Sequence, residues 1–577
     1  MNKKEIQPMT RSQFVLTYGP GSILESKNGP RIIPSIQIGL TREIIEQYEL
    51  HDVRMANLLK KDSENKNVGL FVLPSYEAEK NKRHKRFYRT FPFPKWKICH
   101  GNHESDNSIL FYDPSNEEVC PICKKKSNSY VRFVRACPSG HLDDVNWNYI
   151  VHGHESKKCK TGFEWIASGS SISDISIKCL DCGSEINFGD IYGKTSYCSG
   201  RVPEKEFSDE EFHMKCNQRM RIIPRQSNSL RLASTKTLLT IPKFDKNIHR
   251  LLNRSDIKPV IKAAFNLHNT GVLDEKMFLS LFSDEGVKKI FKNELAEYED
   301  LDDFLNFIEL FYNSELTFDE VLKEEFEALS DFDYNKTDNF SKGNSEIIKF
   351  KINDVEFPFI VAPIHKLRTI TVQKSYQRNP HPKKDKEGNN TNPDNVDIGY
   401  EDFFSGKIWY PAFEGIGEGI FISSLKNPLN ILNLENHAKT WYDQPETYDN
   451  SNNPLYIWWH TLSHALIKSL SYVSGYSMAS IRERVYVEEN GGILLYNTSP
   501  GDDCGLGGLT GVIDNFDEVL RVALDFITNC SYDPLCSDVR INKNRLNGAA
   551  CINCLFISET SCENSNLGLD RHMLLGD

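Results

Sequence analysis

Three kinds of hydrophobic pattern follow one another along the first two thirds of the chain. From about residue 10 to 75, short apolar runs alternate with turn residues, as in PRIIPSIQIG and NVGLFVLPSY, which predicts β-rich structure. Between about 244 and 335, apolar residues recur every three or four positions, as in DIKPVIKAAFNL and LDDFLNFIELFY, which predicts amphipathic helices. A strand-like segment, IIKFKINDVEFPFIVAP, follows, and the proline- and asparagine-rich residues 377–395 are expected to form a mobile loop.

The C-terminal part shows clearer elements. The run LYIWWHTLSHALIKSLSYVSG predicts a long helix that ends at Gly475. RVYVEE and GILLYN predict two short strands, and DNFDEVLRVALDFI predicts an amphipathic helix after a glycine-rich turn.

Length and composition indicate a soluble protein of several domains. A chain of 577 residues is too long for one hydrophobic core. Its apolar runs are shorter than the ~20 residues of a membrane helix, and its start lacks the apolar segment of a signal peptide. We therefore expect a cytoplasmic protein with no membrane partner. The formal charge of −11 argues against a basic coat over the whole surface, although a local basic groove remains compatible with it.

The fifteen cysteines are concentrated in two regions. Nine lie between Cys99 and Cys216, six lie between Cys504 and Cys562, and none lies in the long stretch between. Disulfides are not expected in a reducing cytosol, whereas Zn²⁺ favours four thiolate or imidazole ligands, two of them often from a C-x2-C turn. The alternative is a set of buried thiols that act as small hydrophobic side chains.

Spacing defines three candidate zinc groups. They are Cys120, Cys123, Cys137 and His141; Cys179, Cys182, Cys198 and Cys216; and Cys551 and Cys554 with two of Cys530, Cys536 and Cys562. Cys99, Cys159 and Cys504 remain and are expected to be ordinary thiols. Because none of the groups shows a carboxylate or an open position, the sites are expected to be structural and zinc to be needed for folding.

These patterns predict a multidomain α+β protein with structural zinc-binding modules of ribbon or knuckle type and a helical middle region. We expect five regions: a β-rich N-terminal region, 1–97; a zinc-rich region, 98–220; a largely helical region, 221–345; a mixed region with the mobile loop, 346–453; and a C-terminal zinc-binding region, 454–577.

A basic and aromatic segment is the candidate nucleic-acid contact. Residues 80–97 contain eight lysines and arginines, no acidic residue and five aromatic residues. Basic side chains bind phosphate and aromatic rings stack on unpaired bases, so DNA with single-stranded character is the expected ligand. The candidate contacts are Lys82, Arg83, Lys85, Arg86 and Arg89. A solvated loop with aromatic anchors explains the segment equally well.

No convincing catalytic set emerges from the motifs. Gly193-Lys194-Thr195 resembles the end of a P-loop but lacks its first glycine, so ATP hydrolysis is not expected. His460 and His464 lie one helical turn apart and could share a metal, but the zinc-protease glutamate is absent, and we expect them to support packing by hydrogen bonds. The alternative function is a stand-alone metal-dependent DNA nuclease that uses Asp502, Asp503 and the two histidines.

Several segments, in order, resemble a known family. RSQFVLTYGPGSIL, RFVRACPSGHLDDVNW, SNSLRLASTKTLLTIP, WYPAFEGIGEGIFI and the C-terminal run HTLSHALIKSLSYVSGYSMASIRERVYV to GAACINCLFISETSCENSNLGLDR resemble the DrmB family of bacterial DISARM anti-phage systems. Their C-terminal zinc-binding domain is also similar to one on MrfA-type helicases. The segment LRTITVQKSYQRNP departs from the family pattern.

The resemblance implies a non-catalytic subunit that partners a DrmA-like SNF2-type helicase, contributes to DNA binding and leaves ATP hydrolysis to that helicase. It also implies that 454–577 is a DrmB-type domain with a structural zinc knuckle at Cys551 and Cys554.

Overall fold

The structure, a computed structural model, consists of two compact units, each assembled from separate segments of the chain. It describes all residues except 1–7, 65, 75–87, 102, 104–107, 116–117, 208–209, 334, 353, 382, 386–389, 445–449, 451, 500–506, 543–544 and 577. Unit 1 comprises Met1–Leu50, Gly69–Lys236 and Val372–Phe413, and unit 2 comprises His51–Val68, Thr237–Thr371 and Glu414–Asp577. Two long strands, β19 (Val355–Gln377) and β24 (Lys407–Ser424), each contain a unit boundary.

Unit 1 is built largely from short strands in small antiparallel sheets. In order across each sheet these are β1 (Ile23–Ser26), β2 (Gly29–Ile32) and β4 (Phe91–Pro92); β12 (Glu185–Asn187), β11 (Ile175–Cys179), β10 (Phe163–Ala167), β6 (Ser108–Tyr112), β5 (Lys97–Cys99) and β7 (Ser129–Tyr130); and β13 (Thr195–Tyr197), β14 (Arg219–Pro224), β8 (Phe133–Ala136) and β9 (Leu142–Asp144). The pair β20 (Lys383–Lys384) and β21 (Asn390–Thr391) lies within the predicted loop 377–395. β22 (Val396–Asp397) and β23 (Tyr400–Asp402) pair with β19 and β24.

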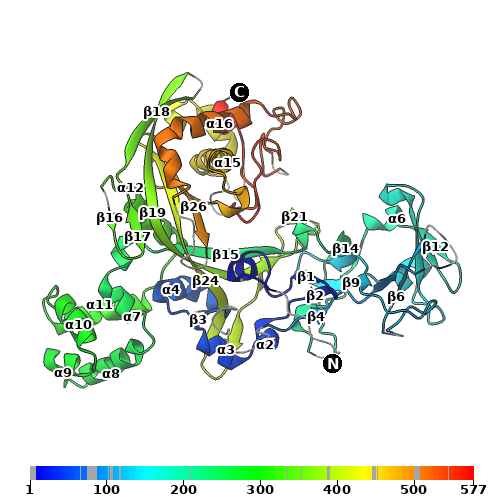
Figure 1. Cartoon of the computed structure of the whole chain (residues 1–577), viewed down its shortest axis with the longest axis horizontal. Coiled ribbons are helices and arrows are strands. Elements are labelled where there is room, and N and C mark those ends of the chain that lie inside the picture. The colour runs from blue at the N-terminus through cyan, green and yellow to red at the C-terminus, as the bar shows by residue number, and fades with distance from the viewer. Residues whose placement is uncertain are drawn as a thin grey trace. The chain divides into compact units, whose positions relative to one another are not determined.

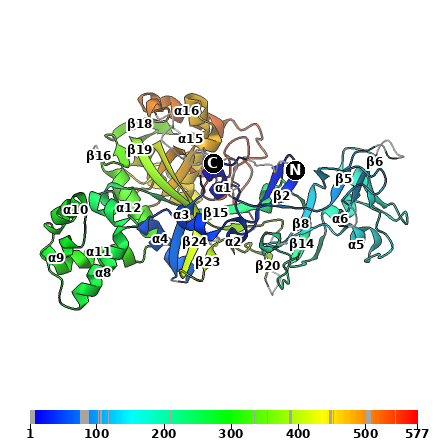
Figure 2. The ribbon, with the colours of Figure 1, turned by 60° about the horizontal axis from the view of Figure 1, so that its bottom comes forward.

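The core of the largest of these sheets is small and aromatic. Phe111, Trp147, Phe163 and Phe188 pack together there and are almost fully buried. Figure 2 shows β5 and β6 beside α5 (Trp147–His152) and α6 (Gly189–Tyr192), the two helices of this part. Strands of two to six residues bury little apolar surface each, so this region needs other constraints to fix its loops.

The N-terminal region differs from the predicted β-rich structure. Besides β1, β2 and β4 and β3 (Asn67–Val72), it contains α1 (Arg11–Leu16), α2 (Ile36–Gly39), α3 (Arg42–Gln47) and α4 (Val53–Lys60). Local capping explains the helices: the Thr10 hydroxyl accepts the Gln13 amide before α1, and the Asp52 carboxylate accepts the Met55 amide before α4. Short apolar runs do not distinguish helix from strand by periodicity alone.

A buried arginine links three segments of unit 1. The guanidinium of Arg378 donates to the carbonyl oxygens of Gly21 at 3.0 Å, Gly140 at 2.9 Å and Leu230 at 2.9 Å, and the side chain has no exposed surface. Arg378 follows the end of β19, and its fixed fork of donors matches this set of carbonyls.

Unit 2 contains a larger sheet whose strands differ widely in length. Its strands run in the order β16 (Asn335–Lys336), β17 (Phe340–Lys342), β19, β24, β26 (Gly492–Ser499) and β25 (Arg482–Tyr486), and β15 (Leu232–Leu239) and β18 (Glu346–Ile352) also pair with β19. The two predicted strands RVYVEE and GILLYN correspond to β25 and β26, and this prediction is confirmed.

Both faces of this sheet are buried. Successive residues of a strand point to opposite faces, so neighbouring side chains belong to different clusters. Ile420, Leu495 and Val485 contribute to one cluster, and Phe421 and Leu494 contribute to the other. The first cluster includes α15 (Pro454–Ser474) and α16 (Phe516–Thr528), which lie side by side against the sheet (Figure 1). Both helices confirm the sequence prediction, and α15 ends at Gly475 in the left-handed conformation that glycine tolerates. Shorter helices, α13 (Pro428–Ile431), α14 (Glu435–Tyr442) and α17 (His572–Leu575), complete this part.

The predicted helical middle region is confirmed. It contains α7 (Asn247–Leu252), α8 (Ile257–Asn269), α9 (Glu275–Ser280), α10 (Glu285–Leu295), α11 (Leu301–Asn313) and α12 (Phe318–Ser330). Side chains of Asp274, Asp284, Asp300 and Thr317 accept backbone amides at the starts of α9 to α12, and Phe278, Phe291 and Phe304 pack edge to face in the core. Among the described residues, no helix is both long and apolar enough for a membrane crossing.

The α12 helix is joined to β25 by a buried ion pair, which gives a test of unit 2. Arg484 Nη1 lies 2.7 Å from Glu325 Oε2, and neither side chain is more than 1% exposed. We expect Glu325→Gln to lower the free energy of unfolding by about 3 kcal/mol, because it removes the nearer of the two carboxylates that face the buried guanidinium and leaves only Glu563, 3.4 Å from Arg484 Nε. Urea unfolding followed by tryptophan fluorescence measures the change. The matched control is Glu518→Gln, which removes the exposed Glu518–Arg521 pair. Equal effects of the two variants would contradict this account.

Candidate metal centres

The first candidate centre joins the end of β5 to a tight turn. Cys99 ends β5, and Cys120 and Cys123 flank the turn that the Lys124 amide closes on the Cys120 carbonyl at 2.9 Å. The Cys99 and Cys123 sulfurs are 3.5 Å apart, and the Cys120 sulfur lies 3.5 Å from His103 Nε2. These four side chains form one cluster of potential ligands.

The second centre brings together three segments of the sheet β13-β14-β8-β9. It consists of Cys137 and His141, on the turn between β8 and β9, with Cys198 and Cys216, which flank the β13–β14 connection. Cys137 Sγ lies 3.3 Å from His141 Nδ1 and 4.0 Å from Cys216 Sγ. The turn requires Gly140, whose φ of +87° is unfavourable for residues with a side chain.

The third centre lies where α5 meets the end of β11. It consists of His152, Cys159, Cys179 and Cys182. His152 Nδ1 lies 2.7 Å from the Asn148 carbonyl oxygen, which can only accept, so Nδ1 carries the proton and Nε2 presents a lone pair. That Nε2 is 3.3 Å from the Cys182 sulfur.

The fourth centre, which follows α16 in unit 2, contains only cysteines and is called the four-cysteine centre below. Cys530, Cys536, Cys551 and Cys554 converge, with sulfur–sulfur distances of 3.5 Å for Cys530–Cys551, 3.8 Å for Cys536–Cys554 and 3.7 Å for Cys551–Cys554. The Cys551 amide also donates to the Cys554 sulfur at 3.3 Å. All four ligand positions are supplied by the protein, so the arrangement is closed.

The observed distances fit tetrahedral zinc. At ordinary Zn–S and Zn–N bond lengths, sulfurs of one tetrahedron are about 3.8 Å apart, and a sulfur and a nitrogen are about 3.5 Å apart. The contacts in the four centres lie close to these edge lengths, and the ligand atoms of each centre lie within 4.8 Å of one another. Soft thiolates with imidazole in four-ligand sets favour Zn²⁺, which would hold the connected segments together in each centre.

The surroundings lower the thiol pKa at four of the candidate ligands, Cys123, Cys137, Cys182 and Cys551. A hydrogen bond from the Lys125 backbone amide lowers the pKa of Cys123 to about 6. Contact with the Ser184 hydroxyl, with further help from the Ser184 backbone amide, lowers the pKa of Cys182 to about 6. Since zinc binds the thiolate, a lowered pKa reduces the proton competition for the site at neutral pH.

The structure groups the cysteines differently from the spacing-based expectation. Cys120 and Cys123 do not share a centre with Cys137 and His141, and Cys179 and Cys182 do not share one with Cys198 and Cys216. The first pair is instead completed by Cys99, at the end of β5, and His103, and the second by His152, at the end of α5, and Cys159. Cys99 and Cys159, expected to be ordinary thiols, each occupy a ligand position.

The histidines of the first and third centres were missed by sequence reasoning. His103 stands four residues after Cys99 in CHGNH, the same spacing as Cys137 and His141 in CPSGH, and this spacing could have identified it as a ligand. No comparable sequence pattern marks His152. At the C-terminus, the structure selects Cys530 and Cys536 as the partners of Cys551 and Cys554. Cys562 lies elsewhere, with its sulfur 3.2 Å from His460 Nε2. Cys504 lies outside the described residues.

The candidate DNA and nuclease residues fall mostly outside the described part of the chain. Lys82, Arg83, Lys85 and Arg86 are not described, and neither are Asp502 and Asp503. Arg89 is described and exposed, and its backbone amide donates to the Gly39 carbonyl at 3.1 Å.

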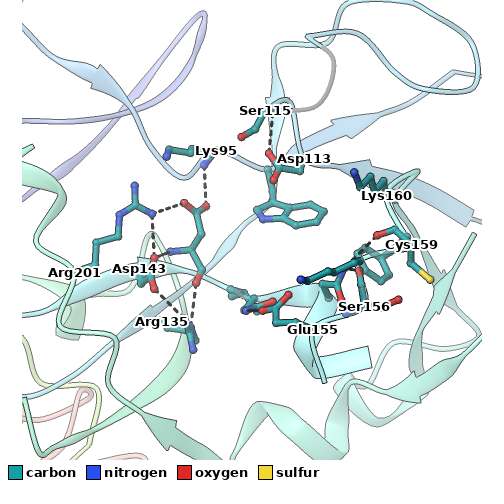
Figure 3. A pocket seen from close by; sticks show the side chains of 18 of the residues that line it. Lys95, Asp113, Ser115, Arg135, Asp143, Glu155, Ser156, Cys159, Lys160 and Arg201 are labelled. Carbon is teal, nitrogen blue, oxygen red and sulfur yellow. Dashed lines mark hydrogen bonds and ion pairs between the residues drawn. The ribbon is translucent and has the colours of Figure 1, made fainter. Parts of the chain in front are cut away.

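A pocket of about 410 Å³ in unit 1 borders the third centre (Figure 3). Arg201 lies at one side, buried, with its guanidinium 3.0 Å from Asp143, 3.2 Å from Asp144 and 2.7 Å from Glu206. Burial raises the pKa of Asp144 to about 6. Cys159 and Lys160 lie at the opposite side. Asp143 also lies 2.9 Å from Arg135, so the charged side chains on that side are held in ion pairs within the pocket wall.

In the C-terminal part, a known zinc-binding family matches the segment that contains the four-cysteine centre. Residues 462–555 match the MrfA Zn-binding domain, a span that contains all four ligands of the four-cysteine centre. Residues 10–232 match a domain of unknown function, DUF8724. The DISARM protein DrmB of Bacillus paralicheniformis is 27% identical over 556 residues, which cover 89% of this chain and 93% of that protein. The resemblance to the DrmB family is confirmed. The chain is also confirmed as a zinc-binding protein.

One solved structure gives a weaker match. The crystal structure of the DUF1998 helicase MrfA bound to DNA aligns with 34% of this chain and 22% of that chain, at 12% identity and a TM-score of 0.19. A likeness at this score supports no inference about fold or function.

The regrouped ligands give a test by metal counting. If Cys120 and Cys137 belong to separate centres, Cys120→Ser and Cys137→Ser should each remove about one zinc per chain, and the double variant should remove two, because a zinc centre rarely survives removal of a ligand. Native mass spectrometry of the full chain measures the ratio. His154→Gln, beside the third centre but not in it, should keep the wild-type count. If the double variant loses no more zinc than either single variant, Cys120 and Cys137 belong to one shared centre and this grouping is wrong.

Proposed function

We propose that this chain is a non-catalytic, zinc-stabilised component of a DISARM-type anti-phage complex that works with an SNF2-like DNA helicase and contributes to DNA binding. The observation that carries the proposal is the match to the DISARM protein DrmB along nearly the whole of both chains. A match of that extent includes both units, and so it is not the result of one shared zinc module.

The chemistry of the centres supports a structural role for the metal. Each of the four centres supplies four protein ligands, all of them cysteine or histidine. Catalytic zinc keeps one position for water or substrate, whereas a four-ligand thiolate site is closed. The energy of ATP hydrolysis would come from the helicase partner, since this chain has no complete P-loop.

The nuclease alternative loses part of its proposed active site. His460 and His464 have no exposed surface, so neither ring can reach a DNA phosphate. A two-metal nuclease needs clustered carboxylates at an accessible surface. The histidines therefore serve another purpose, whichever role Asp502 and Asp503 have.

Co-purification tests the partnership directly. From its own host, gently captured tagged chain should bring down an SNF2-like helicase, and DNA-stimulated ATPase should be present in the complex and absent from the chain alone. Capture from a host that lacks the helicase gene is the control. Recovery of the chain alone, with magnesium-dependent DNA cleavage, would overturn the proposal in favour of the nuclease.

Charge reversal tests the basic segment. Glutamate at Arg83, Lys85, Arg86 and Arg89 should weaken DNA binding and reduce the salt slope of log Kd by about 0.7 for each phosphate of a single strand that the variant no longer neutralises. Fluorescence anisotropy at several salt concentrations measures both effects, and helicase association should persist.

The matched control for this variant reverses four exposed lysines of the helical region, Lys262, Lys276, Lys289 and Lys292. It changes the net charge by the same amount and should leave the salt slope unchanged. Equal weakening of DNA binding in the two variants would show that overall charge, rather than the basic segment, governs the interaction.

A further inference from the structure

A fifth set of ligand-type side chains lies in the core of unit 2, apart from the four-cysteine centre. His460 and His464 are one turn apart on α15 and therefore point the same way. Glu483 on β25 faces α15 from the sheet, on the same side as Val485. Cys562 joins them from the C-terminal segment. The two histidines have no exposed surface, and Glu483 and Cys562 are 1% and 8% exposed.

The four ligand atoms converge on one point. His460 Nε2 lies 3.1 Å from His464 Nε2, 2.9 Å from Glu483 Oε1 and 3.2 Å from Cys562 Sγ, and His464 Nε2 lies 3.3 Å from Glu483 Oε1. Donors bound to one tetrahedral zinc are about 3.3–3.6 Å apart for these atom types. The cluster is therefore slightly tighter than a zinc tetrahedron and needs only small shifts to become one.

The hydrogen bonds on the far side of each imidazole define the protonation. His460 Nδ1 lies 3.3 Å from the Gly568 carbonyl oxygen, and His464 Nδ1 lies 2.9 Å from the Leu555 carbonyl oxygen. Because a carbonyl only accepts, each Nδ1 must carry the hydrogen, and each neutral ring presents a lone pair at Nε2. Two lone pairs, a carboxylate oxygen and a sulfur then face one another in a buried space, an arrangement that a cation stabilises.

The remaining contacts hold the carboxylate and the sulfur in place. Cys562 Sγ accepts the backbone amides of Asn564 at 3.3 Å and Asn566 at 3.2 Å, contacts that orient the sulfur and would stabilise it as a thiolate beside a cation. The Glu563 amide donates to Glu483 Oε1 at 3.2 Å, and the Ser463 hydroxyl hydrogen-bonds to Oε2. Such second contacts are characteristic of metal ligands, whose orientation they fix.

We propose that His460, His464, Glu483 and Cys562 bind a further Zn²⁺ ion. Two imidazoles, a carboxylate and a thiolate form a mixed set that suits four-coordinate zinc, and their burial leaves no position for substrate. The ion would attach the C-terminal segment to α15 and β25 independently of the four-cysteine centre. The inference does not depend on the proposed function of the chain.

Metal counting on the full chain tests the site. Inductively coupled plasma mass spectrometry should give about five zinc ions per wild-type chain, one for each ligand set in the described residues. His464→Gln should lower the ratio to about four and reduce the melting temperature. His268→Gln, which removes a histidine paired with exposed Asp302, should keep five. A His464→Gln chain with the wild-type ratio would overturn the proposal.

A second measurement requires no variant and so does not depend on a mutant that folds. Anomalous diffraction from crystals of the wild-type chain at the zinc absorption edge should place a peak between His460 Nε2 and Cys562 Sγ. If peaks appear at the other four centres but not at this cluster, the four side chains form a hydrogen-bonded cluster with one protonated imidazole, and the proposed zinc site is wrong. A peak only at the edge of another metal would overturn the assignment to zinc.

Discussion

Tetrahedral coordination is the constraint on which the zinc-rich part of unit 1 depends. Its strands contain two to six residues, and its largest apolar cluster is built around a few aromatic side chains. Three closed ligand sets lie within this part of the chain and connect the strand ends and turns. Structural zinc contributes about 10–16 kcal/mol of apparent binding free energy in zinc-finger peptides, which is comparable to the net stability of a whole folded domain, about 5–15 kcal/mol. Zinc bound in these sets would therefore contribute a large share of the stability of this region.

The same constraint explains why the ligand sets were only partly predictable. Local turns such as CPIC and CLDC are visible in the sequence, because the spacing of two ligands on one turn is a property of a few residues. The other ligands depend on which strands pair. In the structure β5 and β6 pair with each other, as do β8 and β14, and these pairings bring Cys99 to Cys120 and Cys216 to Cys137. A sequence pattern contains no information about that pairing.

Hydrophobic periodicity predicted helices and strands better than cysteine spacing predicted the ligand sets. It worked best for elements that bury one face or their whole surface in a core. The helical middle region, α15, α16, β25 and β26 were all predicted, because long apolar periods and flanking caps or glycines mark them. The N-terminal helices were missed because their apolar runs are short and their caps involve single side chains such as Asp52. Buried charges were also missed: Arg378 and Arg484 occur in ordinary sequence contexts, and only the fold shows that each has its partners.

The position of the metal ligands relative to the cores bears on what the chain can do. In unit 2 the four-cysteine centre follows α16, and His460 and His464 lie on α15, so both ligand sets adjoin the same pair of packed helices. A ligand set placed inside a packed core cannot open for substrate without disrupting that core. Metal bound in this unit would consequently tie the C-terminal segment to the buried helix α15 from within the core.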